Sequence, residues 1–314
     1  MNKLEQQKLL SRISRKYYIE DLTQQEIAKK LNISRTKVSR YLTRAKKEKI
    51  VEIKINSSGV SFEELESMVE SKFDIKECHI VPSFDEKEEI YRQMAVSLSG
   101  ILERILENGS YLGVGWGVTL KTVSGYLEPD KKMDIKVVPL LGGLGKVGIE
   151  VHTNSVAKTL ADKYGGVSYV MHTPAVLDSK EARDIMQKDS SIREIIEMTD
   201  SIDAAVIGMS DIGPDSTMIK TGNFKAEEFS KLEKLGVAGD VNLIFIDESG
   251  KQIESEIDER IVRIQIEKLK KIKNVIGIAY GQNKVRVIRG AIIGKIINIL
   301  ITDERTAEDI LKYR

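Results

Sequence analysis

The side chains best suited to contact nucleic acid follow one another in a short segment near the start of the chain. The candidates for contacts with bases or phosphates are Ser34, Arg35, Thr36, Lys37, Ser39 and Arg40. Arginine can pair bidentately with guanine, and hydroxyl groups suit phosphate oxygens. The pattern leaves open which of these side chains contact bases and which contact phosphates.

A second set of candidates consists of three glycine-rich turns that follow strand-like segments. They lie at residues 113–117, 140–145 and 208–213, and Thr119 adds a hydroxyl donor after the first of them. Glycine lets backbone N–H groups approach an anion, and a helix N-terminus favours negative charge. One such turn is weak evidence, because tight turns between strands and helices use glycine anyway. Three in a matching context predict a phosphate-type ligand.

The first set of residues needs two short helices that cross at a tight turn, and the segment 24–42 has the pattern of such a helix-turn-helix. Thr23 is a good N-cap, and Glu26 three residues later completes a capping box. Ala28 is small where the helices must cross, and Asn32 tolerates the left-handed conformation that the turn requires. The apolar anchors have the right spacing at Ile27, Leu31, Ile33, Val38 and Tyr41. The alternative is a chance helical hairpin in a globular core.

Charge is distributed unevenly along the 314 residues. Residues 1–50 hold 14 Lys and Arg against 5 Asp and Glu, whereas the remaining residues hold 35 against 43. A basic head on a mildly acidic body predicts contact with nucleic acid at the head alone. A solvated basic face is the alternative that charge by itself would leave open.

The larger part of the chain alternates helical and strand-like segments. Several strand-like segments are apolar throughout, as parallel strands buried on both faces are. The alternation predicts a Rossmann-like α/β domain in which ligands bind at the carboxyl ends of the strands. A strand is also expected at 50–55, one continuous helix at 180–199 and a strand at 243–246. The turn-rich stretch 56–59 predicts a boundary between a domain at 1–56 and a domain at 57–314.

Other classes of function fit poorly. A single cysteine, Cys78, excludes an intramolecular disulfide, and with only three histidines no common structural zinc site is expected. The turn at 113–119 reads G-x-G-x-G-x-T, which matches neither a dinucleotide fingerprint nor a P-loop, so no cofactor is expected. The most apolar run is interrupted by Lys295 and Asn298, and the N-terminus resembles no signal peptide. The sequence therefore predicts a cytoplasmic protein that contacts no membrane.

The order of motifs is similar to that of the SorC-type sugar-binding transcriptional regulators, also grouped as deoxyribonucleoside-regulator-like proteins. The resemblance covers nearly the whole chain and rests on the segments LTQQEIAKKLNISRTKVSRYL, GVGWGVTL, VVPLLGGLG, HTNSVAKTLADKYGG, GVAGDVNLIFIDESG and NKVRVIRGAIIGKIINILITDERTAEDIL. It implies a DNA-binding head joined to a domain that resembles sugar-phosphate isomerases and coenzyme A transferases without their catalysis. It also implies a phosphorylated sugar as effector, and a homodimer or homotetramer.

The resemblance also implies which residues bind the effector. They are Gly117, Thr119, Gly142, Gly143, Asp240 and Lys284, and the glycine-rich turn at 113–117 adds Gly115 as a further candidate. In this assignment Gly117 and Thr119 contact phosphate, Asp240 accepts sugar hydroxyls, and Lys284 neutralises phosphate. The alternatives are that Asp240 caps a turn and that Lys284 is an ordinary exposed helix residue.

Two positions depart from the pattern of the family. Val118 stands where many members have a small hydroxyl residue or glycine, and Leu141 stands where some carry Lys or Arg. A Schiff base or charge contact at 141 is therefore not expected here.

Taken together, these features predict a regulator that binds a double-stranded DNA operator with an affinity controlled by a small phosphorylated sugar or related metabolite. Two heads on neighbouring half-sites would require a homo-oligomer. One alternative is a sugar-phosphate isomerase-like enzyme with an appended basic head, although no paired acid and base supports catalysis. The other is a DNA-binding scaffold whose larger domain only oligomerises.

Overall fold

The computed structural model describes residues 3–51, 61–143, 152–213, 216–220, 224 and 226–313. The chain divides into two compact units, Met1–Val60 and Ser61–Arg314. The strand expected at 50–55 and the linker at 56–59 lie largely or wholly outside the described residues. Within the described residues, no helix is both long and apolar enough to cross a membrane.

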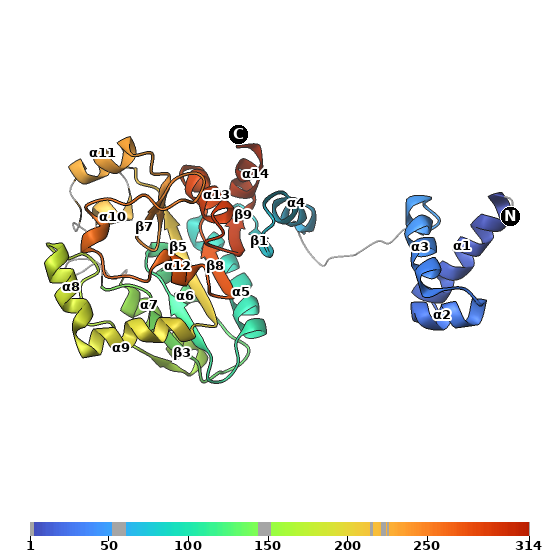
Figure 1. Ribbon diagram of the computed structural model, residues 1–314, viewed down its shortest axis with the longest axis horizontal. Helices are drawn as coiled ribbons and strands as arrows, with labels where there is room; N and C mark the ends of the chain where they lie inside the picture. Colours follow the sequence, from blue (N-terminus) through green and yellow to red (C-terminus); the bar gives the residue numbers. More distant parts are fainter. Residues whose placement is uncertain are drawn as a thin grey trace. The chain divides into compact units, whose positions relative to one another are not determined.

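The described residues of the first unit form three helices, α1 (Lys3–Tyr18), α2 (Gln24–Leu31) and α3 (Arg35–Lys47) (Figure 1). Their apolar faces meet in a small core that buries Ile13, Ile27, Ala28, Val38 and Leu42. These side chains recur at helical spacing, so each helix presents one apolar stripe and leaves its other face to solvent. The unit is the expected helix-turn-helix with one additional helix in front of it.

The second unit is built on a parallel sheet with the strand order β1-β9-β8-β5-β2-β3-β4. These strands are β1 (Glu77–Val81), β2 (Tyr111–Val114), β3 (Lys136–Pro139), β4 (Val167–Ser168), β5 (Ala204–Ser210), β8 (Asn274–Ile278) and β9 (Ile299–Asp303). An antiparallel hairpin of β6 (Gly239–Val241) and β7 (Ile244–Ile246) extends the sheet where β6 pairs with the end of β5. The order runs outward in both directions from β2 and β5, as in a doubly wound fold.

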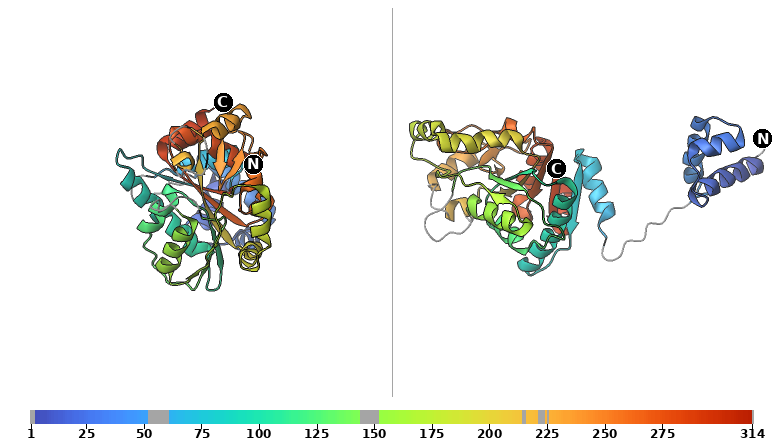
Figure 2. Two further views of the ribbon diagram at one scale, coloured as in Figure 1. Left: turned by 90° about the vertical axis from the view of Figure 1, so that its left-hand side faces the viewer. Right: turned by 90° about the horizontal axis from the view of Figure 1, so that it is seen from below.

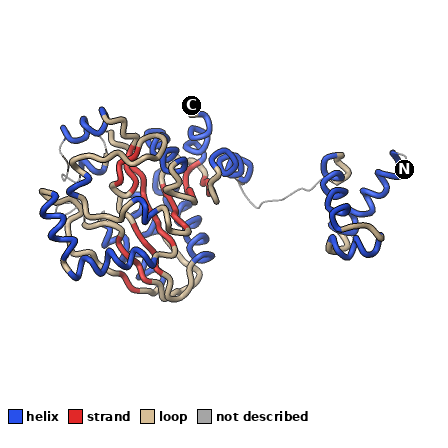
Figure 3. Tube along the Cα trace, in the orientation of Figure 1, coloured by secondary structure: helices blue, strands red, loops and turns tan. Residues whose placement is uncertain are grey.

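Helices cover both faces of this sheet, as Figures 2 and 3 show. Apolar side chains of α5 (Lys87–Ile105), α6 (Val118–Tyr126) and α7 (Thr153–Tyr164) pack with one set of strand residues, which includes Leu112, Val206 and Ile276. Helices α4 (Glu63–Phe73), α13 (Val285–Ile293) and α14 (Glu304–Lys312) pack with the alternate set. Alternate strand residues point to opposite faces, so both faces of the central strands are buried. The Rossmann-like prediction is confirmed.

The remaining helices are α8 (Lys180–Lys188), α9 (Ser190–Met198), the short α10 (Thr217–Lys220), α11 (Ala226–Lys234) and α12 (Ile266–Leu269). The single helix expected at 180–199 was wrong, because the chain breaks at Asp189. Asp189 has ψ 135°, outside the helical region, and its carboxylate accepts a hydrogen bond from the backbone N–H of Ser191 at 3.0 Å. It thereby ends α8 and caps α9. Strand β6 was not expected at all.

Candidate functional site

The turn between α2 and α3 is held by local hydrogen bonds that the sequence predicts. The backbone N–H of Thr23 donates to Glu26 Oε2 at 2.8 Å, and the N–H of Glu26 donates to Thr23 Oγ1 at 3.3 Å. Asn32 has φ 49° and ends α2 in the left-handed region. Ser34 caps the start of α3, because its Oγ accepts a hydrogen bond from the N–H of Lys37 at 3.2 Å. The capping box and the asparagine turn are both confirmed.

We expect Thr23→Ala to lower the free energy of unfolding of the first unit by about 1 kcal/mol, because the N–H of Glu26 at the start of α2 loses its acceptor, the Thr23 hydroxyl. Urea unfolding followed by circular dichroism measures the change. Thr43→Ala is the matched control, because Thr43 lies inside α3 and its hydroxyl donates only to the carbonyl of Ser39. Equal losses in the two variants would show that the cap does not stabilise α2.

One face of α3 presents the predicted DNA contacts to solvent. All of the predicted side chains are exposed, namely Ser34, Arg35, Thr36, Lys37, Ser39 and Arg40. Among the described residues, no ion pair engages Arg35, Lys37 or Arg40. Arg44, further along the helix, is held by Glu48 at 2.6 Å and by Gln6 at 3.3 Å. The cations nearest the start of α3 are therefore those available to a duplex, as in helix-turn-helix proteins that place this end in the major groove.

In the second unit, the glycine turn after β2 leads directly into α6. Gly117 has φ 120°, a conformation that side chains other than glycine rarely adopt, and no side chain caps the helix behind it. The N–H groups of the first turn of α6 therefore have no acceptor from a cap, and the positive end of the helix dipole lies there. Thr119 is half-buried in that turn. The N–H of Gly115 is already used, since it donates to the carbonyl of Val206 at 2.9 Å.

The turn after β3 is arranged differently. Gly142 N–H donates to Val262 O at 3.0 Å, and Gly143 N–H donates to Thr173 O at 2.8 Å. Both donors are therefore satisfied within the protein and are not free for an anion. A Cβ on Gly142 would lie 2.7 Å from backbone atoms of Pro174 and Ala175, so glycine is required there by close packing. The prediction that Gly142 and Gly143 lie next to the effector remains a prediction, and their N–H groups are not available to bind it.

We expect Gly142→Ala to destabilise the second unit by about 2 kcal/mol, because the added methyl overpacks rigid backbone. Gly100→Ala is the matched control. Gly100 lies on the exposed side of α5 with no atom within 4 Å of its Cβ position, so alanine should add up to about 1 kcal/mol of stability there. Thermal unfolding of both variants measures the difference, and a neutral Gly142→Ala would contradict the packing argument.

Beside these turns lies a cluster of polar side chains, which we call the polar cluster and define as the buried Asp240 and Asn242, the largely buried Arg263 and the half-buried Lys284. Asp240 and Asn242 are 2% and 1% exposed, and the Arg263 side chain is 9% exposed. Among the described residues, seven buried side-chain atoms lack a hydrogen-bond partner, and four of them belong to this cluster. These are Asp240 Oδ1, Asn242 Oδ1, Asn242 Nδ2 and Arg263 Nε. Leaving a buried polar group unpaired costs about 1–3 kcal/mol, so the concentration at one place indicates a site for a polar ligand or water.

Burial controls the charge in the polar cluster. It raises the pKa of the Asp240 carboxyl to about 7, although the N–H of Leu243 and the positive charge of Lys284 partly offset the effect. Burial also lowers the pKa of the Lys284 ammonium, while Asp211 and Asp240 act in the opposite direction. No ion pair joins Lys284 to either carboxylate among the described residues. Asp240 and Lys284 thus lie in one cluster without an ion pair among the described residues, whereas Arg263 is paired with Asp258.

The sequence left open whether Asp240 caps a turn or contacts the effector, and its two carboxylate oxygens differ in this respect. Its Oδ2 accepts a hydrogen bond from the N–H of Leu243 at 2.8 Å, so the residue does cap the turn between β6 and β7. Its Oδ1 has no partner, which leaves one carboxylate oxygen for another molecule. Lys284 is half-buried and ends a short 3₁₀ segment before α13, so it is not an ordinary exposed helix residue.

Sequence reasoning missed two members of the polar cluster. Asn242 lies in the quoted motif GVAGDVNLIFIDESG, and its position two residues after Asp240 was the signal available. Arg263 had no local signal, because its place depends on pairing with a distant segment. Its backbone forms an antiparallel bridge with Leu141. Some family members carry a basic residue at the position of Leu141.

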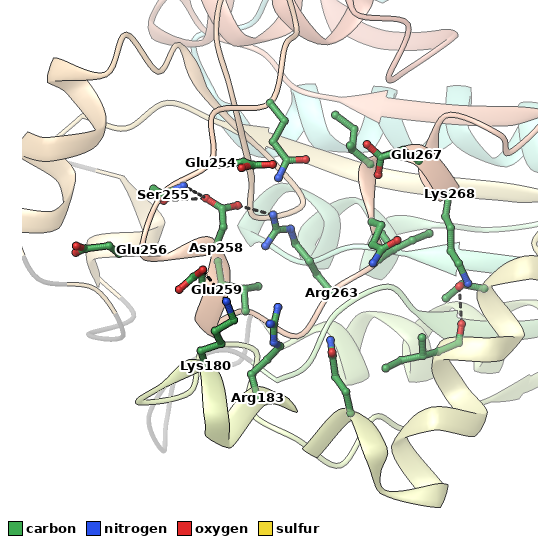
Figure 4. Close-up of a pocket in the computed structure, with 18 of the residues that line it drawn as sticks. Lys180, Arg183, Glu254, Ser255, Glu256, Asp258, Glu259, Arg263, Glu267 and Lys268 are labelled. Carbon is green, nitrogen blue, oxygen red and sulfur yellow. Dashed lines mark hydrogen bonds and ion pairs between the residues drawn. The ribbon is translucent and has the colours of Figure 1, made fainter. Parts of the chain in front are cut away.

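A cavity of about 920 Å³ lies between α8, α9 and the segment 252–268. Figure 4 shows that Arg263 lines it and contacts Asp258, at an Nη2–Oδ1 distance of 2.5 Å. Arg263 is shared with the polar cluster, whereas none of the effector residues predicted from the sequence lines this cavity. Its other cations, such as Lys180 and Lys268, are neutralised by nearby carboxylates.

Comparisons with known proteins agree with both parts of this structure. A family model described as "Putative sugar-binding domain" matches residues 60–312, and a model of sigma-70 region 4 matches residues 15–48. The deoxyribonucleoside regulator of Bacillus subtilis is 30% identical over 309 residues, covering 96% of this chain and 97% of the relative. The sorbitol operon regulator of Klebsiella pneumoniae is 32% identical over 314 residues, covering 97% and 98%.

Solved structures give the same result. The crystal structure of the full-length sorbitol operon regulator SorC from Klebsiella pneumoniae superposes with a TM-score of 0.75 at 30% identity, covering 98% of this chain and 99% of that one. A DeoR family transcriptional regulator from Listeria monocytogenes superposes with a TM-score of 0.72 at 27% identity, covering 79% and 98%. These relatives are named regulators and not enzymes, which rules against the isomerase alternative. The chain therefore belongs to the SorC-type sugar-binding transcriptional regulators, with a helix-turn-helix head and a sugar-binding α/β domain.

Proposed function

We propose that this regulator binds operator DNA through the exposed face of α3 and that a small phosphorylated sugar, bound at the polar cluster, controls its affinity for DNA. The observation that carries the effector site is the set of four unpartnered polar atoms in Asp240, Asn242 and Arg263. Sugar hydroxyls both donate and accept hydrogen bonds, so a sugar can satisfy a carboxylate, an amide and a guanidinium at once.

Two features support a phosphate on that sugar. No side chain among the described residues caps the first turn of α6 behind Gly117, so its N–H donors can face an anion at the positive end of the helix dipole. Lys284, which acts electrostatically on Asp240, supplies a cation that no carboxylate neutralises at ion-pair distance among the described residues. In this proposal Gly117 and Thr119 bind the phosphate, Asp240 binds hydroxyls, and Gly115 and the Gly142–Gly143 turn form the wall.

Control of DNA binding follows if the effector favours one arrangement of two or more chains. We propose a homodimer or homotetramer whose heads reach half-sites about one helical turn of DNA apart, which requires about 34–36 Å or a multiple of it. A ligand that binds one arrangement more tightly shifts the population toward it and thereby changes the affinity for DNA. Two relatives are named for deoxyribonucleosides and for the sorbitol operon, which supports a carbohydrate metabolite as the effector class.

Thermal unfolding of the full chain tests the effector proposal. The panel contains ribose 5-phosphate, 2-deoxyribose 5-phosphate, glucose 6-phosphate, sorbitol 6-phosphate and each parent sugar. We expect at least one phosphorylated compound to raise the melting temperature while its parent sugar does not, since only the former engages α6 and Lys284. The compound should be recovered unchanged. A flat response to every phosphorylated compound would contradict the proposed effector class.

A further inference from the structure

Asn242 occupies a constrained position in the polar cluster. It is the first residue of the two-residue turn that joins β6 to β7, in which Val241 pairs with Ile244. Asn242 and Leu243 have φ 55° and φ 61°, so both lie in the left-handed region, as in the tight turns that close two-residue hairpins. The turn fixes the direction of the Asn242 side chain, and this residue is 1% exposed.

The amide of Asn242 points at the glycine turn that leads into α6. Its Oδ1 lies 2.8 Å from the position that a Cβ would occupy on Gly115, so any side chain at 115 would displace the amide. Neither Oδ1 nor Nδ2 has a hydrogen-bond partner among the described residues. A buried amide with no partner is rare in folded proteins, because its groups lose their hydrogen bonds to water without replacement.

The turn does not itself require this amide. Glycine adopts the left-handed conformation more readily than asparagine, and the hydrogen bond that holds the turn comes from Asp240, which accepts from the N–H of Leu243. A side chain that serves only the turn would be expected to bond to nearby backbone, as asparagine does in turns. The Asn242 amide makes no such bond within the part of the chain that the structure describes, so its polar atoms are explained better as contacts for a bound molecule.

We infer that Asn242 is a specificity-determining residue that recognises a vicinal diol of the effector. An amide is planar and carries donors on Nδ2 and an acceptor on Oδ1, so two neighbouring hydroxyls can pair with it, one accepting and one donating. Asp240 Oδ1, on the same hairpin, accepts from a further hydroxyl. This inference rests on the proposed effector site. It adds that the ligand must be a polyhydroxylated compound, and that the Asn242 amide distinguishes this compound from its deoxy analogue.

The variant Asn242→Gly separates a ligand contact from a structural role. Glycine keeps the left-handed turn and removes only the amide. We expect its melting temperature without ligand to equal or exceed that of the unchanged chain, because an unsatisfied buried group is lost. We expect its dissociation constant for the tightest compound of the panel to rise at least tenfold. The preference for ribose 5-phosphate over 2-deoxyribose 5-phosphate should fall to within twofold.

Asn108→Gly is the matched control. Asn108 precedes β2 at the end opposite Gly115, and its Oδ1 accepts a hydrogen bond from the N–H of Asp134 at 2.9 Å. This variant should lose thermal stability and keep the affinity for ligand, the reverse of Asn242→Gly. The inference is overturned if Asn242→Gly binds the ligand with unchanged affinity, or if it melts several degrees lower without ligand. If no panel compound binds the unchanged chain, the proposed effector class fails, and the melting temperature of Asn242→Gly alone still tests the role of the amide.

Discussion

Replacing Arg40 with alanine is expected to lower the affinity of the full chain for its operator by about 10- to 100-fold, the loss of one bidentate contact with a base or of one phosphate contact in the major groove. Arg40 lies on the exposed face of α3, and no ion pair engages it among the described residues. Its guanidinium is therefore available without breaking any contact within the head. Fluorescence anisotropy with the DNA upstream of the chain's own reading frame measures the change.

Arg44→Ala is the matched control for this substitution. Arg44 is on the same helix and has the same charge, but Glu48 and Gln6 hold its guanidinium. We expect its removal to change the affinity less than threefold. The slope of affinity against salt concentration should fall by about one in Arg40→Ala if the contact is to phosphate, and hardly at all if it is to a base. Equal losses of DNA affinity in Arg40→Ala and Arg44→Ala would contradict the proposal that the exposed face of α3 contacts DNA.

The second large effect concerns the pH dependence of stability at Asp240. Burial raises the pKa of this carboxyl to about 7 in the folded protein, above the value of 3.8 of an unperturbed carboxyl. Well below pH 3.8 the carboxyl is protonated in both the folded and the unfolded states. Between pH 3.8 and 7 the unfolded chain releases this proton while the folded chain keeps it, which favours the unfolded state. The contribution of Asp240 to stability is therefore fully present below pH 3.8, decreases up to about pH 7 and is constant above it.

We expect the unchanged chain to lose on the order of 4 kcal/mol between pH 4 and pH 7 relative to Asp240→Asn, at about 1.36 kcal/mol for each unit of pKa. Asparagine at 240 retains an oxygen that can accept from Leu243 and carries no charge. Urea unfolding at a series of pH values measures the difference. Asp162→Asn serves as control, because the Asp162 side chain is 60% exposed and its profile should parallel that of the unchanged chain. Parallel profiles for Asp240→Asn would contradict the raised pKa.

The head was predictable from the sequence because its structure depends on neighbours in the chain. The capping box at Thr23 and the left-handed turn at Asn32 are local, and both are confirmed. The parallel sheet followed from the alternation of apolar strands and helices. The break at Asp189 did not, because apolar residues keep helical spacing on both sides and the cap is a single carboxylate. Strand β6 is three residues long, too short to show a period of its own.

The candidate site was predictable only in part, because the sequence shows its local turns but not its contacts with distant segments. Glycine turns at strand ends are visible in the sequence, and the turn before α6 was found. The state of the Gly142 and Gly143 donors depends on Val262 and Thr173, which no local pattern connects with them. Arg263 joins the polar cluster because its segment pairs with Leu141 far away in the sequence. Burial and missing partners, which distinguish Asn242, exist only after the chain has folded.

Titration of labelled upstream DNA with the full chain, with and without each phosphorylated sugar of the panel, tests the central claim most directly. The proposed function predicts that at least one compound changes the affinity for DNA at least tenfold. It also predicts that Lys284→Gln, which removes the ammonium group of the polar cluster, retains DNA binding and loses this response. An affinity for DNA that no phosphorylated sugar alters, or a response that survives in Lys284→Gln, would contradict it.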